Sequence, residues 1–429
     1  MIERKLVVWP LLAYGGLRMP LALLELPLFV LLPNFYSDTL GLPLGLVGGI
    51  LFTTRLLDAF LDPAIGTAID RKKNLHFRTW IWLSLPVSTI GFVALMHPPE
   101  NLAYLSWWLA GMSIVTYLGY SVASIAYQAW GSQIGTTDPQ RAQVTGFREA
   151  FGLAGVLLAA AWLTPSGIPI LTALFVSLSA VAAGLLLFAP TGNRPRSWNT
   201  LTESELKTVG VTDDIKNSFR SVRANRPFRW LLAALLINGI ATAIPATLLL
   251  FFVTDILSDA AQAPLFLLIY FVAGAIGMPV WIRLSNRLGL RKTWIVGIGV
   301  SVAAFTWTLT LGPGDSQSFM VICGLTGLAL GADLALPPAL LASVIAAHGD
   351  SGRNEGAYFG VWSFATKLNL AAAAGLALPA LSLAGYVPGT PGAASLVIIY
   401  AGLPCVMKLL CAAVLWVTPI PDNVTIQPT

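Results

Sequence analysis

The stretch IPILTALFVSLSAVAAGLLLFA, residues 168–189, decides the class of fold because no charged side chain interrupts it. A helix needs about 20 consecutive apolar residues to cross the hydrocarbon core of a bilayer. In lipid every backbone polar group must be satisfied internally, which a helix does within one segment. The stretch therefore predicts a membrane-spanning helix.

The composition of the whole chain agrees with this prediction. Of the 429 residues, 56% are hydrophobic and 10% are charged, whereas an ordinary soluble domain has about 25% charged residues. So few charges cannot cover a soluble surface, which excludes a soluble enzyme, a disordered chain and a disulfide scaffold. Cys323, Cys405 and Cys411 lie in apolar runs without the spacing of metal ligands. No nucleophile–base set or phosphate loop appears, so we predict neither an enzyme nor a cofactor.

Twelve apolar segments can be marked along the chain, in two sets of six. They are 6–35, 42–69, 77–96, 102–130, 144–164, 168–189, 230–254, 264–284, 293–311, 319–346, 358–383 and 393–417. The sequence thus predicts an all-α integral membrane protein with twelve transmembrane helices in two pseudo-symmetric six-helix halves. We place the halves at 1–190 and 229–429, and between them a cytoplasmic linker, 191–228, with an amphipathic helix at 201–226.

Basic residues set the expected orientation. Apart from five basic residues (Arg18, Arg55, Arg148, Lys367 and Lys408), every Lys and Arg falls in the N-terminus, the linker, alternate loops or the segment ends next to those loops. The opposite loops hold acids and no Lys or Arg. Lys and Arg stay preferentially on the cytoplasmic side. We therefore expect a multi-pass protein of a bacterial inner membrane with both termini cytoplasmic. The net charge of +5 then reflects topology and does not indicate nucleic-acid binding.

A faint repeat links the two halves at their cytoplasmic loops. Asp70 and Arg71 follow the second segment, and Arg287 and Arg291 follow the eighth. With Arg141, these are the predicted gating residues, whose charges would pair with a neighbouring helix end in one conformation and separate in the other. As an alternative, the clusters act only as topological anchors.

The second segment contains the most informative charges, Arg55, Asp58 and Asp62, followed by Pro63. Spacings of three and four residues place the three charges on one helix face. Two carboxylates one turn apart repel each other, and burial further disfavours their ionised forms. A bound Na⁺ would relieve the repulsion because hard cations prefer oxygen ligands, and a bound H⁺ would relieve it as well. Neutralisation of one acid by Arg55 is the structural alternative.

Other polar side chains inside apolar segments predict a solute site, since such residues are costly in a membrane. Arg18 and Glu25 lie nearly in line on one helix and could pair. Asp333 precedes Pro337 and Pro338, where we expect the helix to break. Lys367 needs an anion, which Asp58, Asp62 or Asp333 could supply. The predicted solute-binding set is Arg18, Glu25, Tyr120, Ser124, Tyr127, Trp130, Arg148, Asp333, Trp362 and Lys367, with Lys408 as the weakest candidate.

By these residues the sequence resembles the glycoside–pentoside–hexuronide:cation symporter family of the major facilitator superfamily, over almost the whole chain. The stretches that carry the resemblance are residues 35–42, 55–66, 141–148, 225–228 and 353–367. The resemblance implies an alternating-access carrier coupled to Na⁺, Li⁺ or H⁺. It also implies that Asp58 and Asp62 hold the cation with the Ser121 hydroxyl, that Arg148 contacts sugar, and that Lys367 lies near both sites.

The sequence departs from this family where sugar hydroxyls would be bound. The two sugar-binding carboxylates implied by the resemblance fall on Ala22 and Ser124, neither of which is acidic. The resemblance therefore does not imply a galactoside-type substrate for this chain. The leading hypothesis is a monomeric cation-coupled symporter of a small, sugar-like organic solute. The alternatives are a lysophospholipid or amphiphile transporter of the same fold and a membrane sensor that transports nothing.

Overall fold

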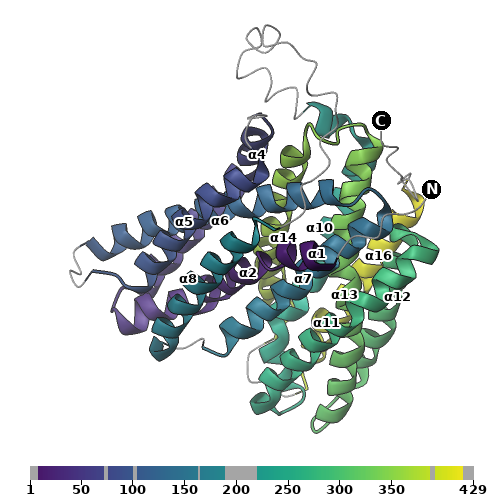
Figure 1. Cartoon of the computed structure of the whole chain (residues 1–429). Coiled ribbons are helices and arrows are strands. Elements are labelled where there is room, and N and C mark those ends of the chain that lie inside the picture. Colours follow the sequence, from purple (N-terminus) through teal and green to yellow (C-terminus); the bar gives the residue numbers. More distant parts are fainter. Residues whose placement is uncertain are drawn as a thin grey trace, which may run out of the picture.

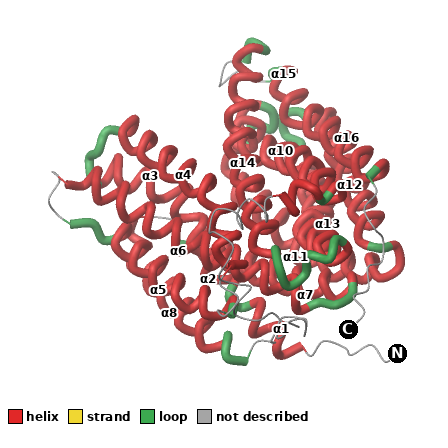
Figure 2. Tube along the Cα trace, turned by 90° about the horizontal axis from the view of Figure 1, so that it is seen from above, coloured by secondary structure: helices red, strands yellow, loops and turns green. Residues whose placement is uncertain are grey.

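The computed structural model describes residues 8–71, 76–99, 104–162, 165–188, 220–386 and 392–418, and these consist of helices joined by short turns and loops. Figures 1 and 2 show long helices gathered into two groups, joined in the middle of the molecule. The prediction of an all-α fold is confirmed. The linker helix expected at 201–226 lies largely outside the described residues.

Eight helical segments of the described part are long and apolar enough to cross a membrane. The sequence stretch 168–189 forms one of them, α8 (Ile168–Leu185). The others contain α5 (Phe77–Met96), α6 (Leu105–Ile134), α10 (Arg226–Asp255), α11 (Ala263–Leu288), α12 (Leu290–Thr306), α13 (Ser316–Ala347), and α15 (Ala394–Val397) with η8 (Ile398–Gly402) and α16 (Leu403–Val417).

Three further long helices carry most of the interior charges: α4 (Leu44–Arg71), α7 (Asp138–Ala160) and α14 (Glu355–Leu383). Helix α7 begins six residues before the expected position 144. Its N-terminus is capped by Thr137, whose hydroxyl accepts a hydrogen bond from the Gln140 N–H. Arg141 therefore lies on the first turn of a helix instead of in a loop.

The first apolar segment is interrupted. It comprises α1 (Val8–Gly15), α2 (Arg18–Leu26), the π-helical η1 (Pro27–Leu31), α3 (Leu32–Asn34) and the π-helical η2 (Phe35–Thr39). A turn at Gly16 and Leu17 separates α1 from α2, whereas residues 18–39 stay helical and change between α-helical and π-helical bonding. Pro27 and Pro33, which lack a backbone N–H, lie where this bonding changes. The expected single span over 6–35 is thus a chain of short helical pieces.

Helix α13 is continuous although it contains two prolines, so the predicted break at these prolines is wrong. It runs without interruption through Pro337 and Pro338 to Ala347. The prolines leave the carbonyls of Asp333 and Leu334 without their usual donors. Neighbouring helices can hold a proline-containing span in place, and α13 packs along α11, α12 and α7.

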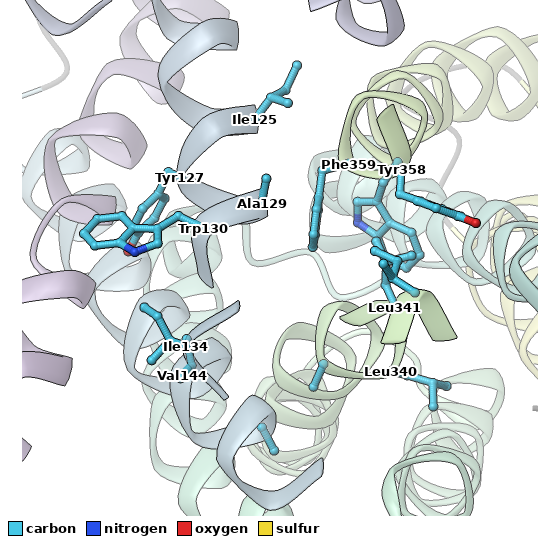
Figure 3. Packing of buried hydrophobic residues seen from close by; sticks show 14 of the residues in the cluster. Ile125, Tyr127, Ala129, Trp130, Ile134, Val144, Leu340, Leu341, Tyr358 and Phe359 are labelled. Carbon is cyan, nitrogen blue, oxygen red and sulfur yellow. The ribbon is translucent and has the colours of Figure 1, made fainter. Parts of the chain in front are cut away.

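The two groups of helices meet through α4 against α14 and through α7 against α11 and α13. The closest approach is at glycines: a Cβ on Gly66 would lie 2.0 Å from the Gly356 carbonyl oxygen, and one on Gly360 would lie 2.5 Å from that of Asp62. One apolar core crosses this contact. Figure 3 shows part of it, with Tyr127, Trp130 and Ile134 of α6 on one side of the view and Leu341 of α13 and Tyr358 of α14 on the other.

Away from this contact each group has its own core. One core contains Leu23, Phe92 and Phe175 of the first group, and the other contains Phe252, Phe319 and Tyr400 of the second. Large apolar side chains such as Phe52, Trp107 and Val406 are more than half exposed on the helices. Such a surface suits contact with lipid chains, as expected of a multi-pass membrane protein.

Candidate cation and solute site

Helices α4, α6 and α14 meet around the ammonium group of Lys367. Its Nζ lies 2.5 Å from Asp58 Oδ2, 2.7 Å from Asp62 Oδ2 and 2.9 Å from Ser121 Oγ. The Ser121 hydroxyl donates to Asp58 Oδ1 at 2.7 Å. The three residues predicted to hold a cation therefore share one site and contact one positive charge.

Both carboxylates at this site are shielded from solvent. Asp58 is 7% exposed and Asp62 is fully buried. Ser363, one turn before Lys367 on α14, donates its hydroxyl to Asp62 Oδ2 at 2.5 Å. The second oxygen of Asp62, Oδ1, has no hydrogen-bond partner among the described residues. A buried carboxylate oxygen without a donor can serve as a ligand for a cation or a proton.

Arg55, which precedes Asp58 by one turn on α4, contacts other groups. Its Nε donates to the Tyr117 hydroxyl at 3.0 Å, and its Nη2 donates to the Leu28 carbonyl at 2.5 Å. Lys367, from the other group of helices, is the residue that forms ion pairs with both acids. Of the three anions considered for Lys367, the structure brings Asp58 and Asp62 to it.

Arg18 and Glu25 pair on the first span, as their spacing suggested. Arg18 Nη1 lies 2.8 Å from Glu25 Oε1 and 3.3 Å from the Tyr120 hydroxyl, and that hydroxyl also donates to Glu25. The pair is partly buried, with 20% and 33% of the two side chains exposed. Three residues of the predicted solute set thus form one cluster.

Arg148 is buried beside its neighbour Glu149 on α7, at 2.6 Å between Nη2 and Oε1. Tyr127 and Trp130 lie in the shared core. There Tyr127 donates its hydroxyl to the Tyr14 carbonyl at 2.9 Å, and Trp130 packs edge-on against Tyr14 at 5.4 Å. Tyr14 was missed by the sequence analysis because an aromatic residue near a helix end usually marks an interface.

Asp333 and Lys408 form a second buried pair within the second group of helices. Lys408 Nζ lies 2.8 Å from Asp333 Oδ2 and 3.0 Å from Asn238 Oδ1, while Trp294 donates to Asp333 Oδ1 at 2.7 Å. Lys408, the weakest candidate in the sequence, therefore has a defined partner. Asp333 is not the partner of Lys367.

Ser124 and Trp362 lie next to the lysine site along their helices. Ser124, one turn beyond Ser121 on α6, accepts a hydrogen bond from Gln128 Nε2 at 3.1 Å. Trp362 is 5% exposed and directly precedes Ser363 on α14. Both are thus positioned by the two helices that hold Ser121 and Lys367.

Two of the predicted gating residues bridge the groups of helices. Asp70, near the end of α4, accepts the backbone N–H groups of Gly356 and Ala357 at 2.8 and 2.7 Å, at the N-terminus of α14. Arg141 on α7 donates to Ser343 on α13 at 2.9 Å and pairs with Asp138 at 2.9 Å. A carboxylate at a helix N-terminus is favourable because the helix dipole is positive there.

The remaining gating candidates have other surroundings. Arg291 donates to the Thr418 carbonyl at 2.7 Å, which ties α12 to the end of α16 within the second group. Arg287 is exposed and Arg71 is half-buried at the end of α4. The repeat seen in the sequence is therefore not a symmetric pair of contacts.

Comparisons with known proteins find transporters that are similar to this chain. The model of the family described as MFS/sugar transport protein matches residues 11–422. A Bacillus subtilis protein named symporter YjmB is 22% identical over 382 residues, which cover 84% of this chain and 80% of the relative. The glucuronide carrier protein homolog of Escherichia coli is 21% identical over 416 residues, covering 91% and 88% of the two chains.

Among solved structures, the fucose:proton symporter of Escherichia coli superimposes with a TM-score of 0.68 at 14% sequence identity, over 95% of this chain and 98% of that one. At this identity the similarity shows a shared fold, that of the major facilitator superfamily.

Proposed function

The chain belongs to the MFS/sugar transport protein family, in agreement with its resemblance to the glycoside–pentoside–hexuronide:cation symporters, and we propose that it couples the movement of one cation, Na⁺ or H⁺, to that of a sugar-like organic solute. The matched family and the similar proteins are secondary transporters with the major facilitator fold and are not enzymes. The coupling ion, the solute and the residues that bind them are the proposal.

The proposal includes a twelve-span topology with both termini cytoplasmic. The twelve proposed spans are the eight apolar helices together with the first segment and α4, α7 and α14. The halves are proposed at 1–190 and 229–429, with the linker 191–228 between them. The accumulation of Lys and Arg in alternate loops supports this orientation.

The observation that carries the function is the set of oxygens around Lys367. Asp58, Asp62 and Ser121 already surround a positive charge at 2.5–2.9 Å, and that charge belongs to a side chain. Carboxylate and hydroxyl oxygens are the ligands that hard cations prefer. A coupling cation can therefore replace the ammonium group at these oxygens.

Replacement of Lys367 would couple cation binding to conformation. Lys367 belongs to α14, whereas its anions belong to α4, so the ion pairs join the two groups of helices. A cation bound to Asp58 and Asp62 replaces Lys367 as their counter-charge. The salt bridges between α14 and α4 are then no longer required, and α14 can move relative to α4. Coupling then follows from the different cation affinities of the two conformations.

We place the solute next to the cation, at two clusters drawn from the predicted set: Arg18 with Glu25 and Tyr120, and Arg148 with Tyr127. The relatives named for glucuronide and isoprimeverose support a sugar-like solute. Asp70, Arg71, Arg141, Arg287 and Arg291 are proposed to control opening at the cytoplasmic end.

The test is a thermal-shift titration of purified protein with NaCl, replaced by choline chloride to keep ionic strength constant, and repeated over a range of pH. We expect Na⁺ or acid to stabilise the wild type and to have no such effect on Asp58→Asn or Asp62→Asn. Asp315→Asn, at the start of α13, is the matched control. Unchanged stabilisation of both variants would remove the cation site. Transport of lysophospholipid but of no sugar would favour an amphiphile carrier.

A further inference from the structure

Four arginines lie where the chain enters its seventh proposed span, and the function proposed above does not use them. Arg220 and Arg223 belong to a short helical stretch, 220–224, and Arg226 and Arg229 belong to the first turn of α10. The chain contains no acid between Arg220 and the far end of α10. These four residues, which we call the arginine patch, therefore form a purely basic segment.

The guanidinium groups of the arginine patch are not neutralised within the described part of the protein. All four side chains are exposed, and no ion pair or side-chain hydrogen bond joins any of them to another described residue. The acid that approaches this segment, Asp350, is buried and accepts hydrogen bonds from Ser221 at 2.9 Å and Tyr358 at 2.7 Å. Its charge offsets at most one of the four.

Two members of the patch lie at the depth of lipid phosphates. The apolar part of α10 begins at Trp230. With a rise of about 1.5 Å per residue, Arg226 and Arg229 lie within about 6 Å of this point along the helix axis. The headgroup layer outside the hydrocarbon core is about 5–8 Å thick. A tryptophan at this boundary is typical of the membrane interface, so both arginines fall inside the headgroup layer.

Arg226, Arg229 and Trp230 also share one face of α10. A helix turns by about 100° per residue, which places the three within one arc of about 100°, while the buried Phe228 and Leu231 lie on the opposite side. The three exposed side chains line a hollow of about 500 Å³. Arginine binds phosphate through paired N–H donors, and the indole ring can cover apolar atoms of the same ligand.

The basic segment is attached to α14, the helix that carries Lys367. Asn225 precedes α10, accepts the Phe228 N–H at 3.0 Å and donates to the Tyr358 hydroxyl on α14 at 2.9 Å. Phe228 packs edge-on against Tyr358, with 4.8 Å between the ring centroids. A ligand held by the arginine patch therefore restrains the start of α10 and, through these contacts, the start of α14.

We propose that the arginine patch binds the phosphate headgroup of an anionic phospholipid, with Arg226, Arg229 and Trp230 in contact and Arg220 and Arg223 adding to the attraction. Basic clusters directly beside a spanning helix attract anionic lipids. The lipid is a fixed partner that stabilises the joint between α10 and α14, and it is not cargo. The inference rests on the proposed placement of this end in the cytoplasmic leaflet and does not depend on the coupling ion or the solute.

A lipid titration of the purified full chain in dodecyl maltoside tests the inference. Dioleoyl-phosphatidylglycerol, dioleoyl-phosphatidylcholine and inorganic phosphate are added separately. The melting temperature is measured for each, and native mass spectrometry counts the retained lipids. We expect phosphatidylglycerol to raise the melting temperature at concentrations where the other two have no effect. Equal stabilisation by the two phospholipids would overturn the proposal, and equal stabilisation by phosphate would mean that the site takes a soluble anion instead of a lipid.

Variants locate the site. Arg226→Gln with Arg229→Gln should weaken phosphatidylglycerol binding at least about tenfold, because each arginine near an anionic lipid contributes about fivefold. Arg226→Lys with Arg229→Lys keeps the charge without the paired donors and should recover part of the binding.

The matched control is Arg283→Gln with Arg353→Gln, which removes two exposed arginines from other cytoplasmic positions and should bind like the wild type. Equal binding by the control and by Arg226→Gln with Arg229→Gln would refute the assigned site. If the latter variant does not fold, the wild-type titration decides alone.

Discussion

Lys367 occupies the place that the proposal gives to the transported ion. Its ammonium group contacts Asp58, Asp62 and Ser121 at distances typical of charge-assisted hydrogen bonds. A side-chain cation on one helix and a free cation would then compete for the same oxygens. Competition of this kind makes the affinity for the free ion depend on where α14 lies.

Lys367→Met tests the competition directly. Removal of the ammonium leaves two buried carboxylates to repel each other, so the variant should be less stable without a cation and should bind Na⁺ more tightly. We expect the Na⁺ concentration that gives half-maximal thermal stabilisation to fall at least about tenfold. Lys367→Arg, which keeps the charge, is the control. A loss of Na⁺ stabilisation in Lys367→Met would show that Lys367 helps to form the site instead of competing for it.

The Asp333–Lys408 pair has the features of a buried ion pair fixed by packing. Lys408→Met alone leaves Asp333 charged and without its cation, which costs about 3–5 kcal/mol in a buried setting. The double variant Lys408→Met with Asp333→Asn removes both charges and should recover most of the lost stability. Melting temperatures of the wild type, both single variants and the double variant provide the measurement. Additive losses in the double variant would mean that the two side chains do not interact.

For single residues, the sequence predicts contacts within a helix better than contacts between helices. The spacing of Arg18 and Glu25, and of Asp58 and Asp62, follows from helical periodicity alone. Lys408 and Asp333 lie 75 residues apart on different helices, and no periodicity connects them. Ser363 was missed for a similar reason, since a serine in a spanning helix usually bonds its own backbone.

Helices α4 and α14 pack closely because glycines, which have no side chain, line their contact. Gly66, Gly356 and Gly360 let the two backbones touch, which carries Asp62 toward Ser363 and Lys367. The same approach places Asp70 at the N-terminus of α14. The position of the acid pair relative to the lysine thus depends on the packing of two whole elements.

Gly66→Ala should disturb this contact, because its Cβ would lie 2.0 Å from the Gly356 carbonyl oxygen and the helices would have to separate. Overpacking of this kind costs about 1–3 kcal/mol. Gly48→Ala is a control on the same helix, where an added Cβ meets nothing within 4 Å. There alanine should stabilise by up to about 1 kcal/mol through helix propensity. Equal melting temperatures of the two variants would contradict the close approach.

Prolines show why element boundaries are difficult to predict from sequence. Pro337 and Pro338 predicted a break that α13 does not have, whereas the helical bonding of the first span changes near Pro27 and Pro33. The same chemical defect, a missing N–H, gives different outcomes because packing decides whether the helix is held. Helix α13 contacts three long neighbours, and the sequence contains no local signal of that support.

On the scale of the whole molecule, one core joins the groups of helices and two others belong to a single group each. The shared core lies at the end where Asp70 and Arg141 make their contacts, which is the end flanked by the basic loops. The sequence predicted the spans and the basic loops because hydrophobicity and charge are local properties. It could not predict which end is closed, since one sequence must be compatible with both conformations of an alternating-access carrier.

A transporter must open the end at which its halves meet, so a covalent link there should stop transport. Ser343 Oγ and Asp138 Oδ1 lie 2.6 Å apart across α13 and α7, and Asp138→Cys with Ser343→Cys places two thiols at this contact. A short bis-methanethiosulfonate reagent, which joins two thiols through disulfide bonds, should abolish solute uptake in the double variant and leave each single variant unaffected, and a reductant that cleaves these disulfides should restore uptake. The single variants separate cross-linking from loss of the Asp138–Arg141 pair. Continued uptake by fully cross-linked protein would mean that this contact stays closed throughout the cycle, and that α7 and α13 do not form the cytoplasmic gate.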